Sequence, residues 1–339
     1  MDAKTLLRNF LVFFGVFLLA SGIALPGYYN IPYPAPLGPQ FEPDVKQEHV
    51  TAIETSQPDF VLIGDSVLYE GVDPLLLAEE SGAAVYSIPV PGSGTASWYL
   101  VLKNVILGAS HRPRYVAVFF RNTMLTVPQY RTTGRYFDLL DDFAARNEPL
   151  LAQLAFIDQM NPLEKFAAQY IPLYSARLEL REDLDNLLRY RVPLALTGCA
   201  RDCVDEAVEA MFGREVNPSA LNQMMEDAAQ TLYDPAEMDF EQQAAGSFLP
   251  YMIELAKANN VTLILVRSKI NAGEPSALAG YNLALENYLT RRDNVILLDY
   301  AADPRLTPAD FVDSLHMNAD GRQKFSKILA EDFREILAR

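Results

Sequence analysis

Short apolar runs recur along the chain and alternate with stretches whose apolar residues follow helical spacing. Most of these runs lack polar alternation, which is typical of strands that are buried on both faces of a parallel sheet. The runs lie at 60–63, 84–88, 115–120, 261–266 and 295–298, and a helix is expected near 242–258 before the fourth of them. Strands that alternate with helices predict an α/β fold, a three-layer α/β/α sandwich around a five-stranded parallel sheet.

Two further helices of this predicted sandwich have clear apolar faces. Trp98, Leu102 and Val105 fall roughly on one side of a helix expected over 95–107. The last helix is expected to begin after Asn318, a residue that suits the N-cap position. Its apolar stripe consists of Phe325, Ile328, Leu329, Phe333 and Ile336.

The N-terminal segment is a long apolar stretch. No charged residue interrupts residues 10–25, and Lys4 and Arg8 precede them. Leucines at positions 6 and 7 lengthen the run, so that 6–25 is long enough for a helix that spans a membrane. Because basic residues flank only its start, the N-terminus is expected inside and the rest of the chain outside the cytoplasmic membrane.

A cleaved signal peptide would account for the same segment, with the small residues Gly22 and Ala24 before the cleavage site. We favour the uncleaved, single-pass anchor. Either interpretation places the main domain outside the cytoplasm, membrane-anchored in the first case and periplasmic or secreted in the second. A buried core helix is disfavoured, because the segment has no polar face.

Composition divides the chain into four parts. They are an anchor or signal segment (1–27), a tether (28–55), an α/β domain (56–125 and 241–339) and a helical insertion (126–240). Six prolines within 26–45 argue against helix and predict an extended tether. The insertion mixes aromatic and acidic residues in helix-like sequence. It is expected to form a cap over the sheet edge or a partner surface, or else a simple second helical domain.

Charge and composition narrow the partners. The 339 residues carry a formal net charge of −16, which disfavours binding to the phosphates of nucleic acid. The two cysteines, Cys199 and Cys203, predict a local disulfide in an extracytoplasmic protein, with free thiols as the alternative. No metal site and no cofactor are expected, because two thiols without nearby histidines make a poor zinc site and no nucleotide-binding glycine pattern occurs.

The candidate chemistry lies at the two ends of the α/β pattern. Ser66 ends a Gly-Asp-Ser triplet directly after the first predicted strand, where open α/β sheets bind ligands. Of the histidines His49, His111 and His316, only His316 has a carboxylate three residues earlier, at Asp313. A serine needs a neighbouring base, and that base needs an orienting group. These residues therefore predict a serine hydrolase triad, although an ordinary strand-to-helix turn would use the same triplet.

Four short blocks around these residues resemble the SGNH (GDSL-like) hydrolases, a family with a flavodoxin-like sheet. The blocks are GDSVLYEGVDP at 64–74, SIPVPGSGT at 87–95, FFRNTM at 119–124 and FVDSLHMNADGRQKFS at 311–326. The resemblance implies Ser66 as nucleophile, His316 as base and Asp313 as the group that orients it. It also implies an oxyanion hole formed by the backbone N–H groups of Ser66 and Gly92 and the side-chain amide of Asn122.

The chain departs from the family pattern at two places. Ser87 stands where the second block usually has asparagine, and Phe120–Thr123 replaces the usual Gly-x-Asn-Asp of the third block. Arg121 is therefore a candidate for holding an anionic or sugar substrate, or else a structural partner of an acidic surface residue. Tyr69 and Trp98 are candidates for an acyl or sugar platform near the mouth of the site, with simple packing as the alternative.

Membrane-anchored, extracytoplasmic proteins of this build resemble the subunits that acylate bacterial cell-surface polysaccharides, in several systems beside a multispanning O-acyltransferase. The resemblance implies a serine O-acyltransferase or esterase whose substrate is an acylated carbohydrate or a small ester, with acetyl as the first candidate acyl group. The alternatives are a stand-alone secreted esterase and a non-catalytic accessory subunit of a membrane complex.

Overall fold

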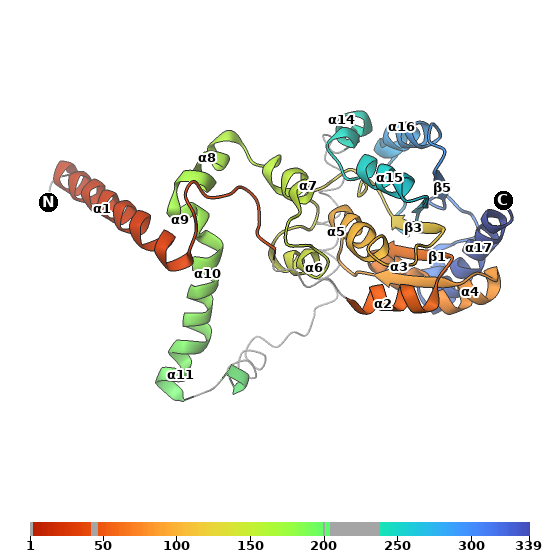
Figure 1. Cartoon of the computed structure of the whole chain (residues 1–339), viewed down its shortest axis with the longest axis horizontal. Coiled ribbons are helices and arrows are strands. Elements are labelled where there is room, and N and C mark those ends of the chain that lie inside the picture. The colour runs from red at the N-terminus through yellow and green to blue at the C-terminus, as the bar shows by residue number, and fades with distance from the viewer. Residues whose placement is uncertain (1–2, 42–46, 199–200, 204–237) are drawn as a thin grey trace. The chain divides into compact units, whose positions relative to one another are not determined.

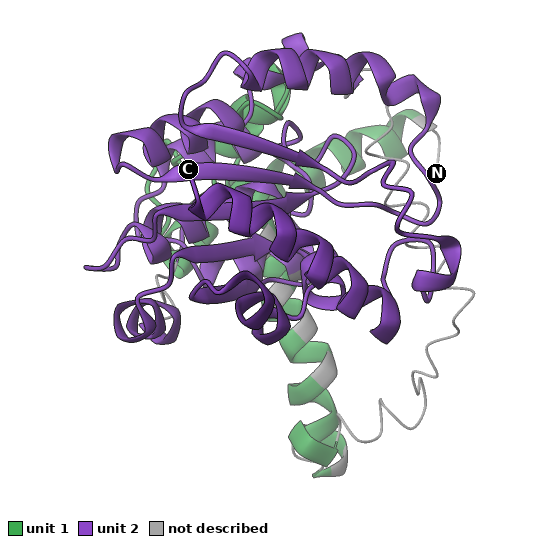
Figure 2. Ribbon diagram, turned by 90° about the vertical axis from the view of Figure 1, so that its right-hand side faces the viewer, with its two compact units in different colours: residues 1–39, 157–226 green, residues 40–156, 227–339 purple. Residues whose placement is uncertain are grey.

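The computed structural model describes residues 3–41, 47–198, 201–203 and 238–339. The chain divides into two compact units, which Figure 2 distinguishes by colour. Unit 1 comprises Met1–Pro39 and Ile157–Glu226, and unit 2 comprises Gln40–Phe156 and Asp227–Arg339.

Unit 2 is built on a five-stranded parallel sheet with the order β2-β1-β3-β4-β5. Its strands are β1 (Phe60–Gly64), β2 (Val85–Pro89), β3 (Tyr115–Phe120), β4 (Thr262–Arg267) and β5 (Val295–Asp299). All five predicted strands are confirmed. The most apolar ones, β1 and β3, lie in the middle of the sheet and are buried throughout, as expected of strands covered on both faces.

Helices cover both faces of this sheet (Figure 1). The helices of unit 2 are α2 (Gln47–Ser56), α3 (Ser66–Gly71), α4 (Pro74–Ser81), α5 (Thr95–Leu100), α6 (Phe137–Asp141), α7 (Pro149–Ala152), α14 (Phe240–Ala245), α15 (Leu249–Ala258), α16 (Ala279–Leu289) and α17 (Ala319–Leu337), with shorter turns η1 (Val101–Ile106), η2 (Gly134–Tyr136), η7 (Ser276–Leu278) and η8 (Pro308–Asp310), and η3 (Gln153–Ile157) after α7. Alternate residues of the strands enter two separate cores, so that the unit is the expected three-layer sandwich.

The core on one face is formed by the strands with α3, α4 and α17. Asn318 caps α17 by accepting a hydrogen bond from the backbone N–H of Gly321 at 2.9 Å, and all five residues of the predicted stripe are buried. Each large apolar side chain buried in this way contributes roughly 1.5–3 kcal/mol to folding. The stripe therefore fixes the C-terminal helix, and the loop before it, against the strands.

The core on the other face includes α2, α5, α15 and α16. The helix expected near 242–258 is two helices, α14 and α15, because the chain turns at Gly246 and Pro250 occupies the first turn of the second. The helix expected over 95–107 is α5 followed by the π-helical turn η1.

The second half of the predicted tether is also helical: α2 buries Ile53 in the core. The prolines of the predicted tether all lie before this helix, and residues 42–46 are outside the described part of the chain.

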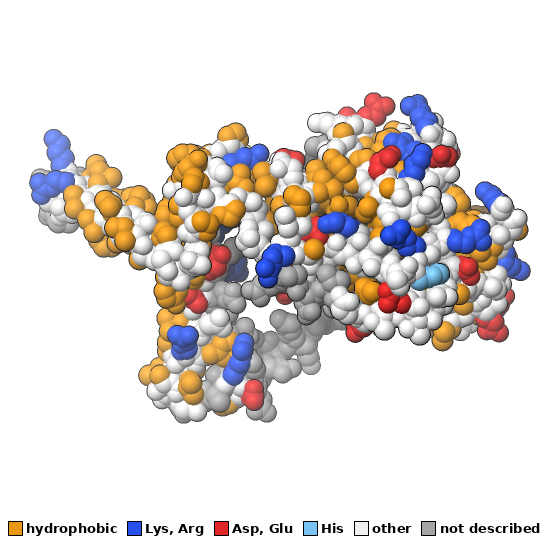
Figure 3. Space-filling model, in the orientation of Figure 1, with side chains coloured by type: hydrophobic (Ala, Val, Ile, Leu, Met, Phe, Trp, Pro, Cys, Tyr) orange, Lys and Arg blue, Asp and Glu red, His pale blue; other side chains and the backbone are white. Residues whose placement is uncertain are grey.

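Unit 1 contains the N-terminal helix α1 (Ala3–Tyr29) and the helices of the insertion. The latter are α8 (Pro162–Tyr170), α9 (Pro172–Ser175), α10 (Arg177–Asn186), η4 (Leu187–Arg191) and α11 (Val192–Thr197). Within the Lys4–Tyr29 part of α1, the most apolar 18-residue window has a mean hydropathy of 2.2, and none of that window is buried. This helix is long and apolar enough to span a membrane, and its hydrophobic surface is visible in Figure 3.

The end of α1 corrects one expectation. The helix continues through Pro26 to Tyr29, although prolines from residue 26 onward predicted its end there. Proline lacks a backbone N–H and costs one helical hydrogen bond. The chain still closes the last turn, where the Ile31 N–H donates to the carbonyl of Pro26 at 3.1 Å.

The predicted insertion is shared between the two units. Its residues 126–156 fold with the sheet, whereas Ile157–Glu226 groups with the N-terminal segment. A cap or a separate helical domain remains a prediction. The disulfide between Cys199 and Cys203 also remains a prediction, because Cys199 lies outside the described residues. Cys203 itself is not a free cysteine.

Candidate active site

The order of the strands identifies one crevice at the sheet edge. In a parallel sheet of order 2-1-3-4-5, the connections leave β1 and β3 toward opposite sides, and ligands bind beyond the carboxyl ends of these two strands. Ser66 is the second residue after the end of β1, and Asn122 is the second residue after the end of β3. The topology alone therefore places both residues at the crevice.

The first two residues of the Gly-Asp-Ser triplet shape the turn between β1 and α3. A Cβ at Gly64 would lie 2.8 Å from Leu68 Cβ and 3.0 Å from Phe119 Cβ, so that only glycine fits there. Asp65 caps α3, accepting a hydrogen bond from the Val67 N–H at 2.9 Å. Ser66 is the first residue of the helix, and the opening N–H groups of a helix have no partner within the helix itself.

A short loop after η8 presents the other two residues. Phe311 and Met317 form an antiparallel bridge that closes the loop, and the Val312 N–H donates to the His316 carbonyl at 2.9 Å. Asp313 Oδ1 accepts hydrogen bonds from the backbone N–H groups of Leu315 and His316, both at 2.7 Å. These bonds use one carboxylate oxygen to shape the loop and leave the other oxygen for the imidazole.

The side chains of Ser66, His316 and Asp313 form one hydrogen-bonded chain. His316 Nε2 lies 2.8 Å from Ser66 Oγ, and His316 Nδ1 lies 2.8 Å from Asp313 Oδ2. Burial by itself would raise the pKa of Asp313, but hydrogen bonds from the His316 ring and from two backbone N–H groups outweigh it and hold the pKa below its ordinary value. Asp313 is thus a carboxylate that accepts from Nδ1–H and leaves Nε2 to accept from the serine.

Two other residues of the predicted site have unusual backbone conformations. Gly92 has φ of +86° and Asn122 has φ of +49°, a region that costs energy for a residue with a side chain. Asn122 is buried, and within the described chain neither atom of its amide has a hydrogen-bond partner. A buried, unpaired amide donor is costly unless another group binds it.

Arg121 lies beside this asparagine at the end of β3 and is buried. Its Nη2 is 3.9 Å from Asp65 Oδ2, an ion-pair distance that is too long for a hydrogen bond. Its Nε and Nη1 have no hydrogen-bond partner among the residues that the structure describes. The acidic neighbour is thus the buried cap of α3 and not a surface residue, and the role of Arg121 in substrate binding remains a prediction.

The two predicted platform residues differ in their surroundings. Tyr69 lies on α3, one turn after Ser66, and is exposed. Trp98 is fully buried on α5, and its indole N–H donates to Ser93 Oγ at 2.9 Å. Trp98 is therefore a core residue and offers no face to a substrate, whereas Tyr69 remains a candidate.

The structure adds a residue that the sequence did not indicate. The guanidinium of the half-buried Arg131 lies over the rings of Tyr130 and Tyr136, at 5.0 and 5.2 Å from their centroids. A Cβ at Gly92 would lie 3.1 Å from Tyr136 Cε1 and 3.9 Å from Arg131 Nη1. Arg131, which has φ of +55°, is in none of the ion pairs among the described residues. No motif or period marks this segment, so that only the fold reveals its place beside Gly92.

Comparisons with known proteins do not assign the chain to a family. No protein-family model and no curated protein matches the sequence. Two solved structures resemble the chain at 12% identity and a TM-score of 0.39 each: a "putative acylhydrolase" from Bacteroides fragilis NCTC 9343, with 82% of this chain and 87% of that one covered, and a GDSL-like lipase from Bacteroides thetaiotaomicron VPI-5482, with 86% and 95% covered. Neither likeness is strong enough to transfer chemistry to this chain.

Proposed function

We propose that the chain is a membrane-anchored serine enzyme of acyl transfer, an O-acyltransferase or esterase that acts on acyl esters of a cell-surface glycan. One observation carries the proposal: the unbroken hydrogen-bonded chain from Asp313 through His316 to Ser66. An imidazole held on one side by a carboxylate and on the other by a serine hydroxyl is the arrangement that activates serine as a nucleophile.

The proposed reaction has two steps. Ser66 Oγ attacks the ester carbonyl while His316 Nε2 takes its proton, and the imidazolium then gives that proton to the departing alkoxide, leaving an acyl-serine. In the second step, water or a sugar hydroxyl loses its proton to Nε2 and attacks the acyl-serine, and Ser66 Oγ recovers the proton as it leaves. Asp313 keeps the imidazole in the required tautomer throughout.

The negative oxygen of each tetrahedral intermediate needs fixed donors. The backbone N–H groups of Ser66 and Gly92 and the amide of Asn122 are the proposed donors. The strained backbone and the unpaired amide of Asn122 support this role, because the amide has no partner among the described residues and can donate to an oxyanion.

The glycan substrate and the location are the less direct parts of the proposal. Arg131 and its two tyrosine rings would suit an acidic or carbohydrate group next to the acyl ester. The apolar helix α1, with Lys4 and Arg8 at its start, supports a single-pass anchor with the enzyme outside the cytoplasm. A multispanning membrane protein that supplies the acyl group is the proposed partner.

Fluorophosphonate labelling of the full-length protein tests the activated serine. The wild type should be labelled, Ser66→Ala should not, and Ser314→Ala should label like the wild type. Ser314 is a matched control because it lies two residues before His316 and its hydroxyl has no part in the hydrogen-bonded chain. Labelling that survives Ser66→Ala, or a folded wild type without any label, would refute the enzyme and favour an accessory subunit.

Acyl transfer is separated from hydrolysis by adding an acceptor. With p-nitrophenyl acetate as donor, a transferase should release nitrophenol faster when an acceptor glycan is present, and acetylated glycan should appear. An esterase should show neither effect.

A further inference from the structure

Helix α8 in unit 1 carries an apolar stripe that nothing in the described part of unit 1 covers. Leu163, Phe166 and Tyr170 are 75%, 54% and 52% exposed, and their spacing of three and four residues places them on one face. The rings of Phe166 and Tyr170 are in tilted contact, with 5.2 Å between their centroids. Ala168, on another face, is buried. The helix is therefore oriented, with a large apolar face turned outward.

Short contacts tie this helix to the end of the apolar helix α1. The Ala35 N–H donates to the carbonyl of Gln169 at 2.9 Å. The hydroxyl of Tyr33 is hydrogen-bonded to that of Ser175 on α9. The chain thus returns, more than a hundred residues later, to the point where it leaves α1.

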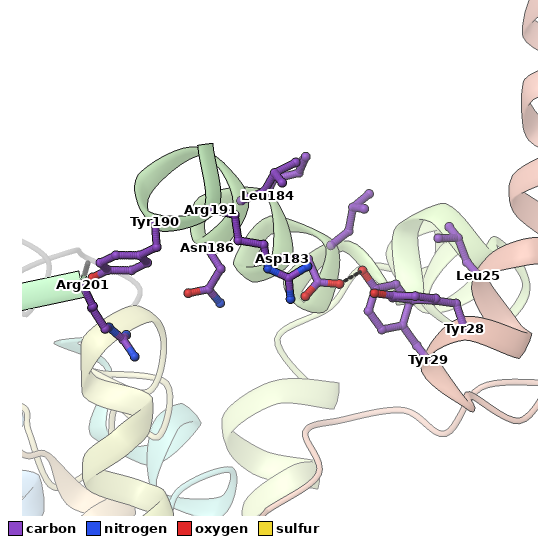
Figure 4. Close-up of a pocket in the computed structure, with 11 residues that line it drawn as sticks. Leu25, Tyr28, Tyr29, Asp183, Leu184, Asn186, Tyr190, Arg191 and Arg201 are labelled. Carbon is purple, nitrogen blue, oxygen red and sulfur yellow. Dashed lines mark hydrogen bonds between the residues drawn. The ribbon is translucent and has the colours of Figure 1, made fainter. Parts of the chain in front are cut away.

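The segments that these hydrogen bonds join are rich in tyrosine. Tyr28 and Tyr29 end α1, and Tyr33 follows it; Tyr170 and Tyr174 come from α8 and α9. In Figure 4, Tyr29 reaches across a groove of about 560 Å³ and donates a hydrogen bond to Asp183 of α10 at 2.8 Å. Tyrosine is enriched where hydrocarbon meets water at a membrane surface, because its ring is apolar and its hydroxyl is not.

We propose that the stripe of α8 lies in the interface of the lipid bilayer that α1 spans, an inference that rests on the proposed anchoring of the chain. The part of the insertion that belongs to unit 1 is then a membrane-surface element and not a lid. An amphipathic helix of this kind buries its apolar face about 5–10 Å into the boundary of headgroups and acyl chains.

Lipid is favoured over a protein partner for two reasons. Hydrogen bonds from Tyr33 and Ala35 join the chain just after α1 to the end of α8 and to α9, and the apolar window of α1 is wholly uncovered. The stripe also has only three large side chains, whereas a stable protein interface needs about 20–30 residues on each side.

Tryptophan fluorescence tests the proposal in the full-length chain reconstituted into phosphatidylcholine nanodiscs. The single native tryptophan, Trp98, is fully buried and supplies a constant background. The tryptophan of Phe166→Trp should emit at a shorter wavelength than that of a solvent-exposed control. Its emission should also fall when the lipid acyl chains are brominated. Leu75→Trp, at a position of α4 that is 82% exposed in unit 2, should show neither change. Phe13→Trp, in the middle of α1, should be quenched more strongly than either.

Each other outcome overturns the proposal in a different way. Quenching at residue 13 without quenching at residue 166 would show that the anchor inserts and the stripe does not touch lipid. If residue 166 then crosslinks to a protein in native membranes, the stripe binds a protein instead. Equal quenching at 75 and 166 would show that contact with lipid is not specific to α8. Absence of quenching at residue 13 would refute the anchor itself, whereas the labelling of Ser66 reports on the enzyme independently.

Discussion

Replacing Asn122 by glycine separates the proposed role of this residue from its structural cost. Glycine adopts the φ of +49° without strain but removes the amide. If the amide is an oxyanion donor, kcat/KM should fall by about 10²–10³, equivalent to about 2.7–4 kcal/mol of transition-state stabilisation. If it is only a turn residue, the rate should hardly change.

The stability of Asn122→Gly should change much less than its activity. Glycine makes the unfolded chain more flexible at a cost of about 0.4–1 kcal/mol, and it relieves backbone strain of a similar size. Removal of a buried amide with no described partner gains about 1–3 kcal/mol, and the cavity left behind offsets part of that gain. The free energy of unfolding should therefore stay near the wild-type value or rise.

Asn260→Gly is the matched control, because Asn260 also has a positive φ, +56°, but lies in an exposed turn after α15. Hydrolysis of p-nitrophenyl acetate, the rate of fluorophosphonate labelling and urea unfolding should be measured on both variants. The control should keep full activity. A loss below about tenfold in Asn122→Gly, at unchanged stability, would refute the donor role.

Two other predictions concern the carboxylate of the site. In Asp313→Asn, the side-chain carbonyl oxygen can keep the two backbone hydrogen bonds, so the fold should be retained. The amide NH₂ then donates to Nδ1, which leaves the proton on Nε2 facing Ser66, and kcat should fall by about 10⁴. A loss below about a hundredfold would argue against the tautomer mechanism. The folded chain holds the pKa of Asp313 below its unfolded value of about 4, so its contribution to stability is complete above that pH and is lost as the pH falls through the folded pKa. Urea unfolding at pH 7 and pH 3 should thus show a smaller acid-induced loss in Asp313→Asn than in the wild type, and equal losses would contradict a lowered pKa at Asp313.

The sheet was predictable because its strands are continuous apolar runs, and short unbroken runs of this kind are typical of strands covered on both faces. The boundaries of β3 at 115–120 needed no correction. The breaks in helices were harder. Nothing in the spacing of residues 95–107 reveals that the α-helix widens into a π-turn at Val101. All six residues of α5 are buried, so no polar face marks where the helical period changes.

The candidate triad was predictable from the sequence because the chain is poor in histidine and only one imidazole has a carboxylate nearby in the chain. The place of Arg131 was not predictable. Its position depends on a positive φ that arginine rarely adopts and on ring contacts with Tyr130 and Tyr136, neither of which a sequence pattern encodes. The contact between α8 and the segment Tyr33–Ala35 was not predictable either, because the two lie more than a hundred residues apart in the chain.

Net charge and local charge lead to opposite expectations for an acidic substrate. A formal charge of −16 repels an acidic glycan at long range. At physiological ionic strength, however, that repulsion is screened beyond about 8 Å. Within that distance of Gly92, the guanidinium of Arg131 is held over two tyrosine rings and has no carboxylate partner in the described chain, so its charge is not cancelled locally. Selection of the substrate would then depend on groups beside the oxyanion hole, and raising the salt concentration should weaken the general repulsion more than the local attraction.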